Sequence, residues 1–210
     1  MRALYIFFAA IFLISSLANA ESKYPKSTKE KRKPMKVFLL AASLRKDSLN
    51  QKLISICNKH FSEHDVNLRQ FSEFDVPLYN GDIEQNEGIP ENATKFANYL
   101  KEADKIIFAV PEYNYSTPGT FKNLIDWTSR IRPMPFKDLE ILIISASPSA
   151  SGGHRGFLHT KVPLEGCGAF VYPGTFSLSN AHQAFKENGE LIDKKLEKDL
   201  HKLLDEFIAK

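Results

Sequence analysis

The sequence predicts an α/β protein with a doubly wound, five-stranded parallel sheet and helices on both faces. Short, almost purely apolar runs recur through the chain, and this is the pattern of strands that are buried on both faces. The runs alternate with longer segments whose apolar residues follow helical spacing. Strands that alternate with helices are joined by right-handed crossovers into a parallel sheet, which gives the predicted class.

The expected elements follow one another between residues 36 and 208. Strands are expected over Lys36–Ala42, Val66–Phe71, Lys105–Val110, Leu139–Ser145 and Ala169–Tyr172. Helices are expected near Leu49–Phe61, from Pro90 to about Ala103, and after Gly119. A further helix is expected from the polar turn at residues 146–155 to about Leu164, and a last one over Lys194–Ile208. Between them, residues 74–82 are expected to form a loop with a turn at Asn80-Gly81.

Polar turns follow the first, third and fourth strands. We name them loop one (42–50), loop three (111–118) and loop four (146–155). In the strand order 2-1-3-4-5 these strands are neighbours, and the switch point falls between the first and the third. Ligands of open α/β sheets bind at the carboxyl ends of the strands beside that point. The three loops are therefore expected to converge on one crevice, a flavodoxin-like geometry.

Loop one contains hydroxyl, amide and guanidinium donors directly before a helix. Such donors, together with the free backbone N–H groups of a helix amino terminus, form a site that suits a phosphate. The loop contains no glycine, so it is neither the dinucleotide fingerprint nor the P-loop. Alternatively, Ser48 or Asn50 only caps the helix. That alternative would leave Ser43 and Arg45 unexplained.

Composition narrows the class of protein. Apolar residues make up 43% of the chain and charged residues 25%, which is ordinary for a globular protein. Positive charge is concentrated in residues 21–36, where seven lysines and arginines face two glutamates, and the chain beyond is net acidic. A basic tail on an acidic domain gives no reason to propose nucleic-acid binding.

No metal site is expected from the cysteines and histidines. Cys57 and Cys167 lack metal-ligand spacing and are expected to be partly buried thiols rather than a disulfide. His154, His159 and His182 show neither ligand spacing nor a partner for a catalytic triad.

The amino terminus has the pattern of a secretory signal peptide over residues 1–20. A short positive start is followed by the apolar run Leu4–Leu17 and by Ala18-Asn19-Ala20, with cleavage expected after Ala20. The run is short for a membrane span, so no stable span is expected after cleavage.

Residues 21–35 are expected to form a basic linker, and residues 36–210 the folded domain. Export, as to a periplasm, is the prediction. The alternative is a cytoplasmic protein that starts at Met35, directly before the first strand.

All three loops resemble those of the NADPH-dependent FMN reductase family, which includes quinone, azo-dye and chromate reductases. The likeness covers about residues 36–190. The family's first loop, G-S-x-R-x-x-S-x-N, is matched by loop one with Ala42 in place of the glycine. Its second, P-E-Y-N-x-S-x-P-G-x-x-K-N-x-I-D-W, is matched throughout by residues 111–127. A serine before a Gly-Gly-x-Arg turn is matched by Ser147 and residues 152–155.

This resemblance implies that the protein binds FMN, with the phosphate at loop one and the flat ring between loops three and four. The implied cofactor-binding residues are Ser43, Arg45, Ser48, Leu49, Asn50, Pro111, Glu112, Tyr113, Asn114, Ser147, Gly152 and Gly153. Ala42 would weaken binding if its methyl group obstructs the phosphate. Glu112 has a structural alternative, in which it bonds the backbone amides of a neighbouring loop.

Two residues are candidates for binding substrate. Tyr113 is one of them, and the other is Arg155, which suits a nicotinamide phosphate or pyrophosphate but could equally form a structural ion pair. Trp127, within the helix after loop three, is expected to be a core or dimer-interface residue.

The implied activity is an FMN-dependent NAD(P)H oxidoreductase of the FMN reductase or quinone reductase type. A hydride would pass from NADPH or NADH through flavin N5 to a quinone-like or other small acceptor, and no catalytic side chain is needed. A homodimer or homotetramer is expected. Two alternatives stay open: an exported flavodoxin-like electron carrier or flavin-binding protein that does not oxidise NAD(P)H, and a non-catalytic protein without flavin.

Overall fold

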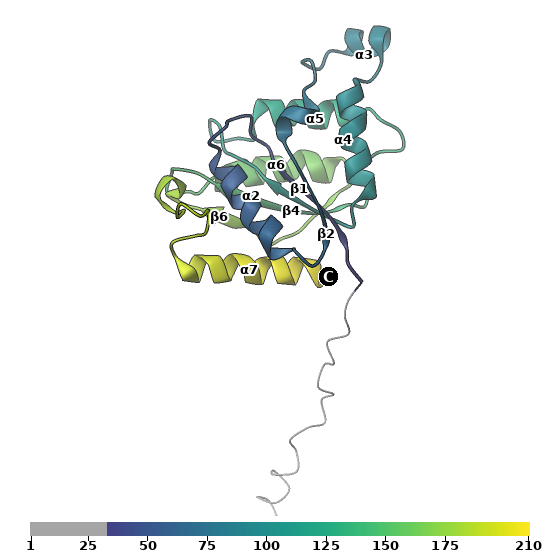
Figure 1. The fold of residues 1–210 in the computed structure, drawn as a ribbon. Coiled ribbons are helices and arrows are strands. Elements are labelled where there is room, and N and C mark those ends of the chain that lie inside the picture. The colour runs from purple at the N-terminus through teal and green to yellow at the C-terminus, as the bar shows by residue number, and fades with distance from the viewer. Residues whose placement is uncertain (1–32) are drawn as a thin grey trace, which may run out of the picture. The chain divides into compact units, whose positions relative to one another are not determined.

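One parallel sheet of order β2-β1-β3-β4-β5 organises the computed structural model, which describes residues 33–210 (Figure 1). Its strands are β1 Lys36–Ala41, β2 Asp65–Arg69, β3 Lys105–Ala109, β4 Glu140–Ala146, β5 Phe170–Val171 and β6 Phe176–Leu178. The predicted fold class and strand order are confirmed. The predicted signal peptide and nearly all of the predicted linker lie outside the described residues.

The fifth position in the sheet holds two short strands. β5 pairs with the start of β4, where Phe170 lies opposite Glu140, and β6 pairs with its end, where Phe176 lies opposite Ile144. The expected strand over 169–172 is therefore shorter than predicted, and β6 was missed. The segment between them contains Pro173, which has no N–H group to donate to a strand ladder.

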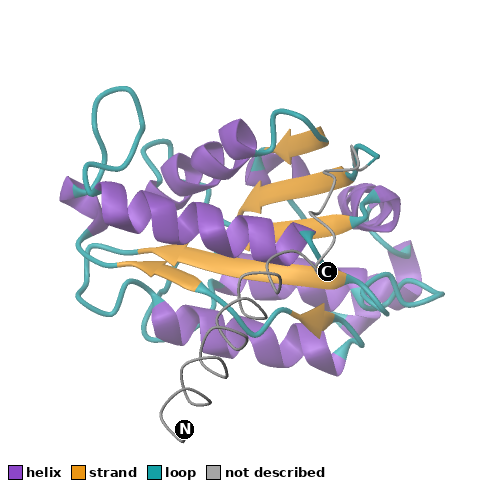
Figure 2. Cartoon of the chain, turned by 90° about the horizontal axis from the view of Figure 1, so that it is seen from below, coloured by secondary structure: helices purple, strands orange, loops and turns teal. Residues whose placement is uncertain are grey.

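Helices lie on both sides of this sheet, so that the strands form one layer between them (Figure 2). The helices are α2 Leu49–His60, α3 Gly81–Glu87, α4 Glu91–Glu102, α5 Gly119–Thr128, α6 His154–Gly166 and α7 Lys194–Ile208, with short 3₁₀ helices at Phe71–Phe74 and Ala181–Gln183. None of the helices in residues 33–210 combines the length and apolarity that a membrane crossing requires.

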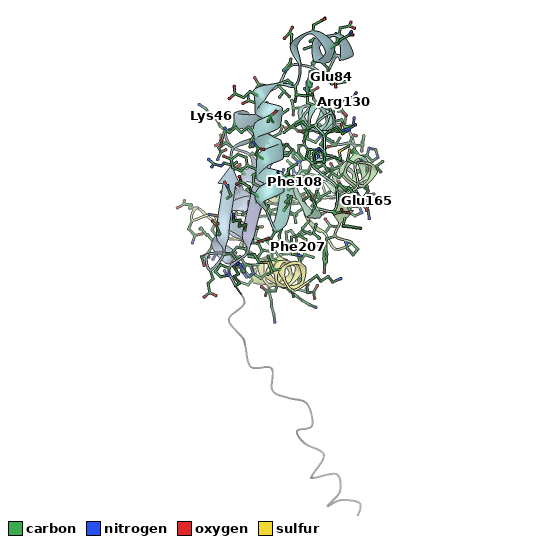
Figure 3. All side chains as sticks on the ribbon, turned by 90° about the vertical axis from the view of Figure 1, so that its right-hand side faces the viewer. Lys46, Glu84, Phe108, Arg130, Glu165 and Phe207 are labelled. Carbon is green, nitrogen blue, oxygen red and sulfur yellow. The ribbon has the colours of Figure 1, made fainter. Side chains whose placement is uncertain are left out.

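Alternate residues of each central strand supply two hydrophobic cores. Val37 and Leu39 of β1 belong to the cluster beneath α2 and α7. Phe38 of the same strand packs with Phe108 and Phe121 beneath α4, α5 and α6, and Phe108 lies in the interior (Figure 3). Because both faces are covered, β1 reads as a continuous apolar run.

The prediction of a turn at Asn80-Gly81 is wrong, because Asn80 is the N-cap of α3 and Gly81 is its first residue. The Asn80 side chain accepts a hydrogen bond from the backbone N–H of Asp82 at 2.9 Å and so caps the helix. α3 projects beyond α4 and α5 (Figure 1), and Glu84 binds Arg130 of the segment after α5 at 3.0 Å (Figure 3). Trp127 is fully buried, and its ring N–H donates to the carbonyl of Pro77.

Candidate functional site

Loops one, three and four meet around a hollow of about 80 Å³ at the carboxyl ends of β1, β3 and β4. It is lined by Ser43, Arg45, Ser48, Leu49, Asn50, Pro111, Glu112, Tyr113, Ala146, Ser147 and Pro148. The predicted convergence of the loops is therefore found. Asn114, Gly152 and Gly153 do not line this hollow, whereas Ala146 and Pro148 do and were not predicted.

Larger hollows lie elsewhere in the described residues. One of about 470 Å³ lies between β5 and α7, and one of about 490 Å³ lies along α4. Neither is at the carboxyl ends of the central strands, where this fold binds ligands. Position and donor chemistry, rather than volume, therefore identify the candidate site.

Loop one keeps its anion-binding groups unused. Ser48 is the N-cap of α2, and its hydroxyl accepts the N–H of Gln51 at 3.3 Å. The backbone N–H groups of Leu49 and Asn50 have no acceptor among residues 33–210, and the Arg45 guanidinium donates no hydrogen bond there either. The capping role that was considered for Ser48 is observed. The two free backbone N–H groups and the guanidinium are donors that suit a phosphate.

Asn50 is committed to holding loop one against β4. Its side-chain N–H donates to the carbonyl of Ala146, and its side-chain oxygen accepts the N–H of Ala146, both at 2.9 Å. The residue is buried. Contact between Asn50 and a phosphate would therefore use the backbone N–H rather than the amide side chain.

Ala42 does not obstruct the hollow. The residue is buried in the core cluster of Phe38 and Leu40, and its N–H donates to the carbonyl of Ala109. Because Ala42 does not line the hollow, replacing the family's glycine costs the site no space.

Loop three turns sharply at Asn114-Tyr115. The backbone N–H of Tyr113 donates to Ser116 and that of Ser116 donates to Tyr113, each at 3.0 Å, which closes a two-residue turn. Both turn residues have positive φ angles, 50° for Asn114 and 63° for Tyr115. Asparagine tolerates this region, which explains why Asn114 forms the turn rather than the wall of the hollow.

Glu112 joins loop three to loop four. One of its carboxylate oxygens accepts the backbone N–H of Arg155 at 2.9 Å and that of Gly156 at 3.2 Å. Gly153, the N-cap of α6, has no side chain, so Glu112 caps the helix from another loop. The structural alternative for Glu112 is therefore observed. A Cβ at Gly156 would lie 3.0 Å from the Cα of Glu112, so the close approach favours glycine.

The glycine pair shapes loop four. Gly152 has a φ of 63°, and a Cβ there would lie 2.6 Å from the carbonyl oxygen of Ser177. Gly153 has a φ of 89° and adjoins Ser145, whose hydroxyl donates to the carbonyl of Gly152 at 2.8 Å. These glycines fold the turn that presents Ser147, and they do not line the hollow.

The remaining candidates for metal or thiol chemistry lie outside the hollow. Burial raises the pKa of the Cys57 thiol to about 12, and burial is also the main cause that raises the pKa of Cys167. Both cysteines are free. In residues 33–210 no group of histidine, cysteine, aspartate and glutamate side chains is arranged to hold a metal ion.

The residues present fit FMN. A guanidinium and two unused backbone N–H groups at loop one suit its phosphate. Pro111, Tyr113 and Ser147 continue from there along loops three and four, where the ring would lie. Among residues 33–210, only Glu112 brings a negative side chain to the lining of the hollow, and its carboxylate is turned to α6.

Comparison with known proteins shows the family. The family model for NADPH-dependent FMN reductases matches residues 35–183. The quinone reductase of Escherichia coli strain K12 is 34% identical over 162 residues, which cover 76% of this chain and 86% of the relative. An NAD(P)H-dependent FMN reductase of Pseudomonas aeruginosa is 34% identical over 168 residues, with 77% and 86% covered.

A solved structure extends the likeness to three dimensions. FerB, a flavoenzyme NAD(P)H:(acceptor) oxidoreductase from Paracoccus denitrificans, matches with a TM-score of 0.70 and 28% identity. The match covers 83% of this chain and 96% of that one.

Proposed function

The chain belongs to the NADPH-dependent FMN reductase family and is a flavin-dependent NAD(P)H oxidoreductase, and on that premise we propose that its electron acceptor is a small quinone-like molecule. The chemistry that FMN supplies when bound is hydride transfer between the nicotinamide and the acceptor. In the overall reaction NAD(P)H, a quinone and one proton give NAD(P)⁺ and a hydroquinone, so two electrons are transferred and the proton comes from solvent.

This chain contributes binding and orientation. Arg45 and the amino terminus of α2 hold the phosphate end of the cofactor. Loops three and four would flank the ring, and Glu112 ties the two loops together through its hydrogen bonds to the amino terminus of α6. The observation that carries FMN binding is the set of unused donors at loop one, since a structural cap alone needs only Ser48. The quinone-like acceptor is proposed from the similarity to the quinone reductase of Escherichia coli.

The test uses the purified chain loaded with FMN. We expect a yellow protein that oxidises NADPH slowly alone and rapidly with a quinone, with ping-pong kinetics. A yellow protein that shows no quinone-dependent turnover would contradict the proposed acceptor. Parallel assays with NADH and NADPH measure the preference between the two dinucleotides.

We propose that the chain forms a homodimer through the exposed face of α6 beyond its first turn. Leu158 and Val162 lie one turn apart on this helix, and they are 45% and 70% exposed. Apolar side chains in that arrangement favour a second copy of the chain as their cover. Light scattering of the chain and of Val162→Lys measures this. A wild-type monomer would overturn the proposal.

Export is proposed from the pattern of residues 1–20 alone. Amino-terminal sequencing of the protein from its native cells is expected to begin at Glu21. A native amino terminus at Met35 would establish the cytoplasmic alternative.

A further inference from the structure

A rim of exposed aromatic and cationic side chains borders the proposed flavin site. Tyr113, which lines the hollow, is 52% exposed, and Tyr115 of the same turn is 66% exposed. The Arg155 guanidinium lies 4.8 Å from the centre of the Tyr115 ring. We call Tyr113, Tyr115 and Arg155 the acceptor rim.

The rim rests on a fixed base. His159 of α6 shares a hydrogen bond of 3.0 Å with Ser116. The Thr160 hydroxyl donates to the carbonyl of Gly156 and accepts from the Thr117 hydroxyl at 2.9 Å. Together with the Glu112 cap, these contacts hold loop three along the first two turns of α6. The backbone of loop three, which carries the two tyrosines, is therefore held against α6, which carries the arginine.

Tyr115 has a left-handed backbone conformation that is unfavourable for a residue with a bulky side chain. It is the second residue of a two-residue turn with positive φ, a position that favours glycine. Its ring is mostly exposed, so burial in the core does not compensate for this conformation. Strain that is retained at an exposed aromatic residue beside a ligand site indicates a function for the ring.

The charge of Arg155 is available to a ligand. Its side chain is 53% exposed and donates no hydrogen bond within residues 33–210. The guanidinium forms a long ion pair with Glu112, 3.7 Å from its nearest carboxylate oxygen, so the structural alternative for Arg155 is observed. This distance is beyond hydrogen-bond range, and the hydrogen-bonding N–H groups of the guanidinium stay free for a second anion. The other oxygen of that carboxylate already binds the amino terminus of α6, which partly neutralises it.

We propose that the acceptor rim binds a planar aromatic electron acceptor that carries an anionic group, such as a carboxylate or sulfonate. The ring stacks against the tyrosines, and the oxyanion pairs with the Arg155 guanidinium. This inference rests on the proposed function and specifies its acceptor. The phosphate of NADPH has the same charge chemistry, so the test must separate the two anions.

The first experiment compares two quinones with one ring system, 1,4-naphthoquinone-2-sulfonate and 2-methyl-1,4-naphthoquinone, with the FMN-loaded full chain at saturating NADPH. We expect Arg155→Gln to lower kcat/KM for the sulfonate roughly ten- to a hundredfold and to leave the neutral quinone nearly unchanged. Arg155→Lys should restore part of the loss. Lys161→Gln, on the same helix, is the matched control.

The second experiment measures binding without turnover. Naphthalene-2-sulfonate, which is not reduced, is titrated calorimetrically into the FMN-loaded chain without NADPH. We expect weaker binding in Arg155→Gln and in Tyr115→Gly but not in Lys161→Gln. Tyr115→Gly relieves the backbone conformation, so its melting temperature should equal or exceed that of the wild type.

Several outcomes would overturn the proposal. Equal losses for both quinones would show that the guanidinium does not recognise the anionic group. A higher KM for NADPH but not for NADH, with an unchanged ratio between the quinones, would assign Arg155 to the dinucleotide. If the wild type reduces neither quinone, the proposed function fails, and the titration with naphthalene-2-sulfonate still decides whether the rim binds an aromatic anion.

Discussion

The carboxylate of Glu112 accepts the backbone N–H of Arg155 at 2.9 Å, so a residue of loop three caps the helix that follows loop four. The cap also binds the N–H of Gly156 and is largely buried. Because the capping residue comes from loop three, its hydrogen bonds connect loop three to the helix that follows loop four. These hydrogen bonds tie the two sides of the crevice together in the absence of a ligand.

Removal of this cap should weaken both the fold and the cofactor site. We expect Glu112→Ala to lower the free energy of unfolding by about 1–2 kcal/mol, the usual effect of losing an N-cap, and Glu112→Gln to lower it less. Urea unfolding measures the stability, and flavin fluorescence measures FMN binding. Glu63→Gln, at an exposed position, is the control. Stability equal to that of the wild type would contradict the capping role.

Arg45 should bind the phosphate rather than the ring of FMN. We expect Arg45→Gln to weaken FMN binding roughly tenfold or more, because a charge-assisted hydrogen bond is lost. Riboflavin, which lacks the phosphate, should bind wild type and variant alike. The neighbouring Lys46 is exposed (Figure 3), and it does not line the hollow, so Lys46→Gln is the matched control. Equal weakening for riboflavin would place Arg45 elsewhere.

Loop three shows how far the sequence could predict this site. Pro111 to Trp127 follows a long, specific motif after an apolar strand, so its strand-turn-helix geometry and its place at the crevice were both predictable. The role of Glu112 remained ambiguous, because its partner Arg155 lies 43 residues away. A contact over that distance depends on how the chain packs, which no local spacing records.

The missed elements have local causes. α3 has seven residues and buries none of them, so no apolar periodicity marked it, although Asn80 was a possible cap. β6 has three residues, too few to establish a pattern. In contrast, α7 was predicted with its observed bounds, Lys194–Ile208, because it presents one continuous apolar face to the sheet.

Gly152 should tolerate no side chain. Gly152→Ala adds a Cβ within 2.6 Å of the Ser177 carbonyl oxygen at a positive φ. We expect a loss of more than about 2 kcal/mol in the free energy of unfolding, since overpacking adds to the backbone strain. Gly88 also has a positive φ but has open space around it, so Gly88→Ala isolates the backbone cost. Equal losses for the two variants would show that the steric contact is relieved by movement of β6.

His201 of α7 should make the free energy of unfolding decrease at acidic pH. Its ring stacks on that of His60 of α2, with centroids 4.5 Å apart. Burial first, and then the neighbouring His60, lower the pKa of His201 below its usual 6.5, whereas Glu197 and Asp205 act in the opposite direction. The unfolded chain therefore binds a proton at a higher pH than the folded chain does. Stability contributed by neutral His201 is fully present above about pH 6.5 and is lost as the pH falls toward the lower folded pKa.

Urea midpoints measured between pH 5 and pH 8 test this acid sensitivity. We expect the wild type to lose stability below about pH 6.5 and His201→Gln to lose less over the same range. His182→Gln, at an exposed histidine, should follow the wild-type curve. Parallel curves for wild type and His201→Gln would show that the loss comes from other groups. A wild-type urea midpoint that rises as the pH falls would contradict the predicted direction of the pH dependence.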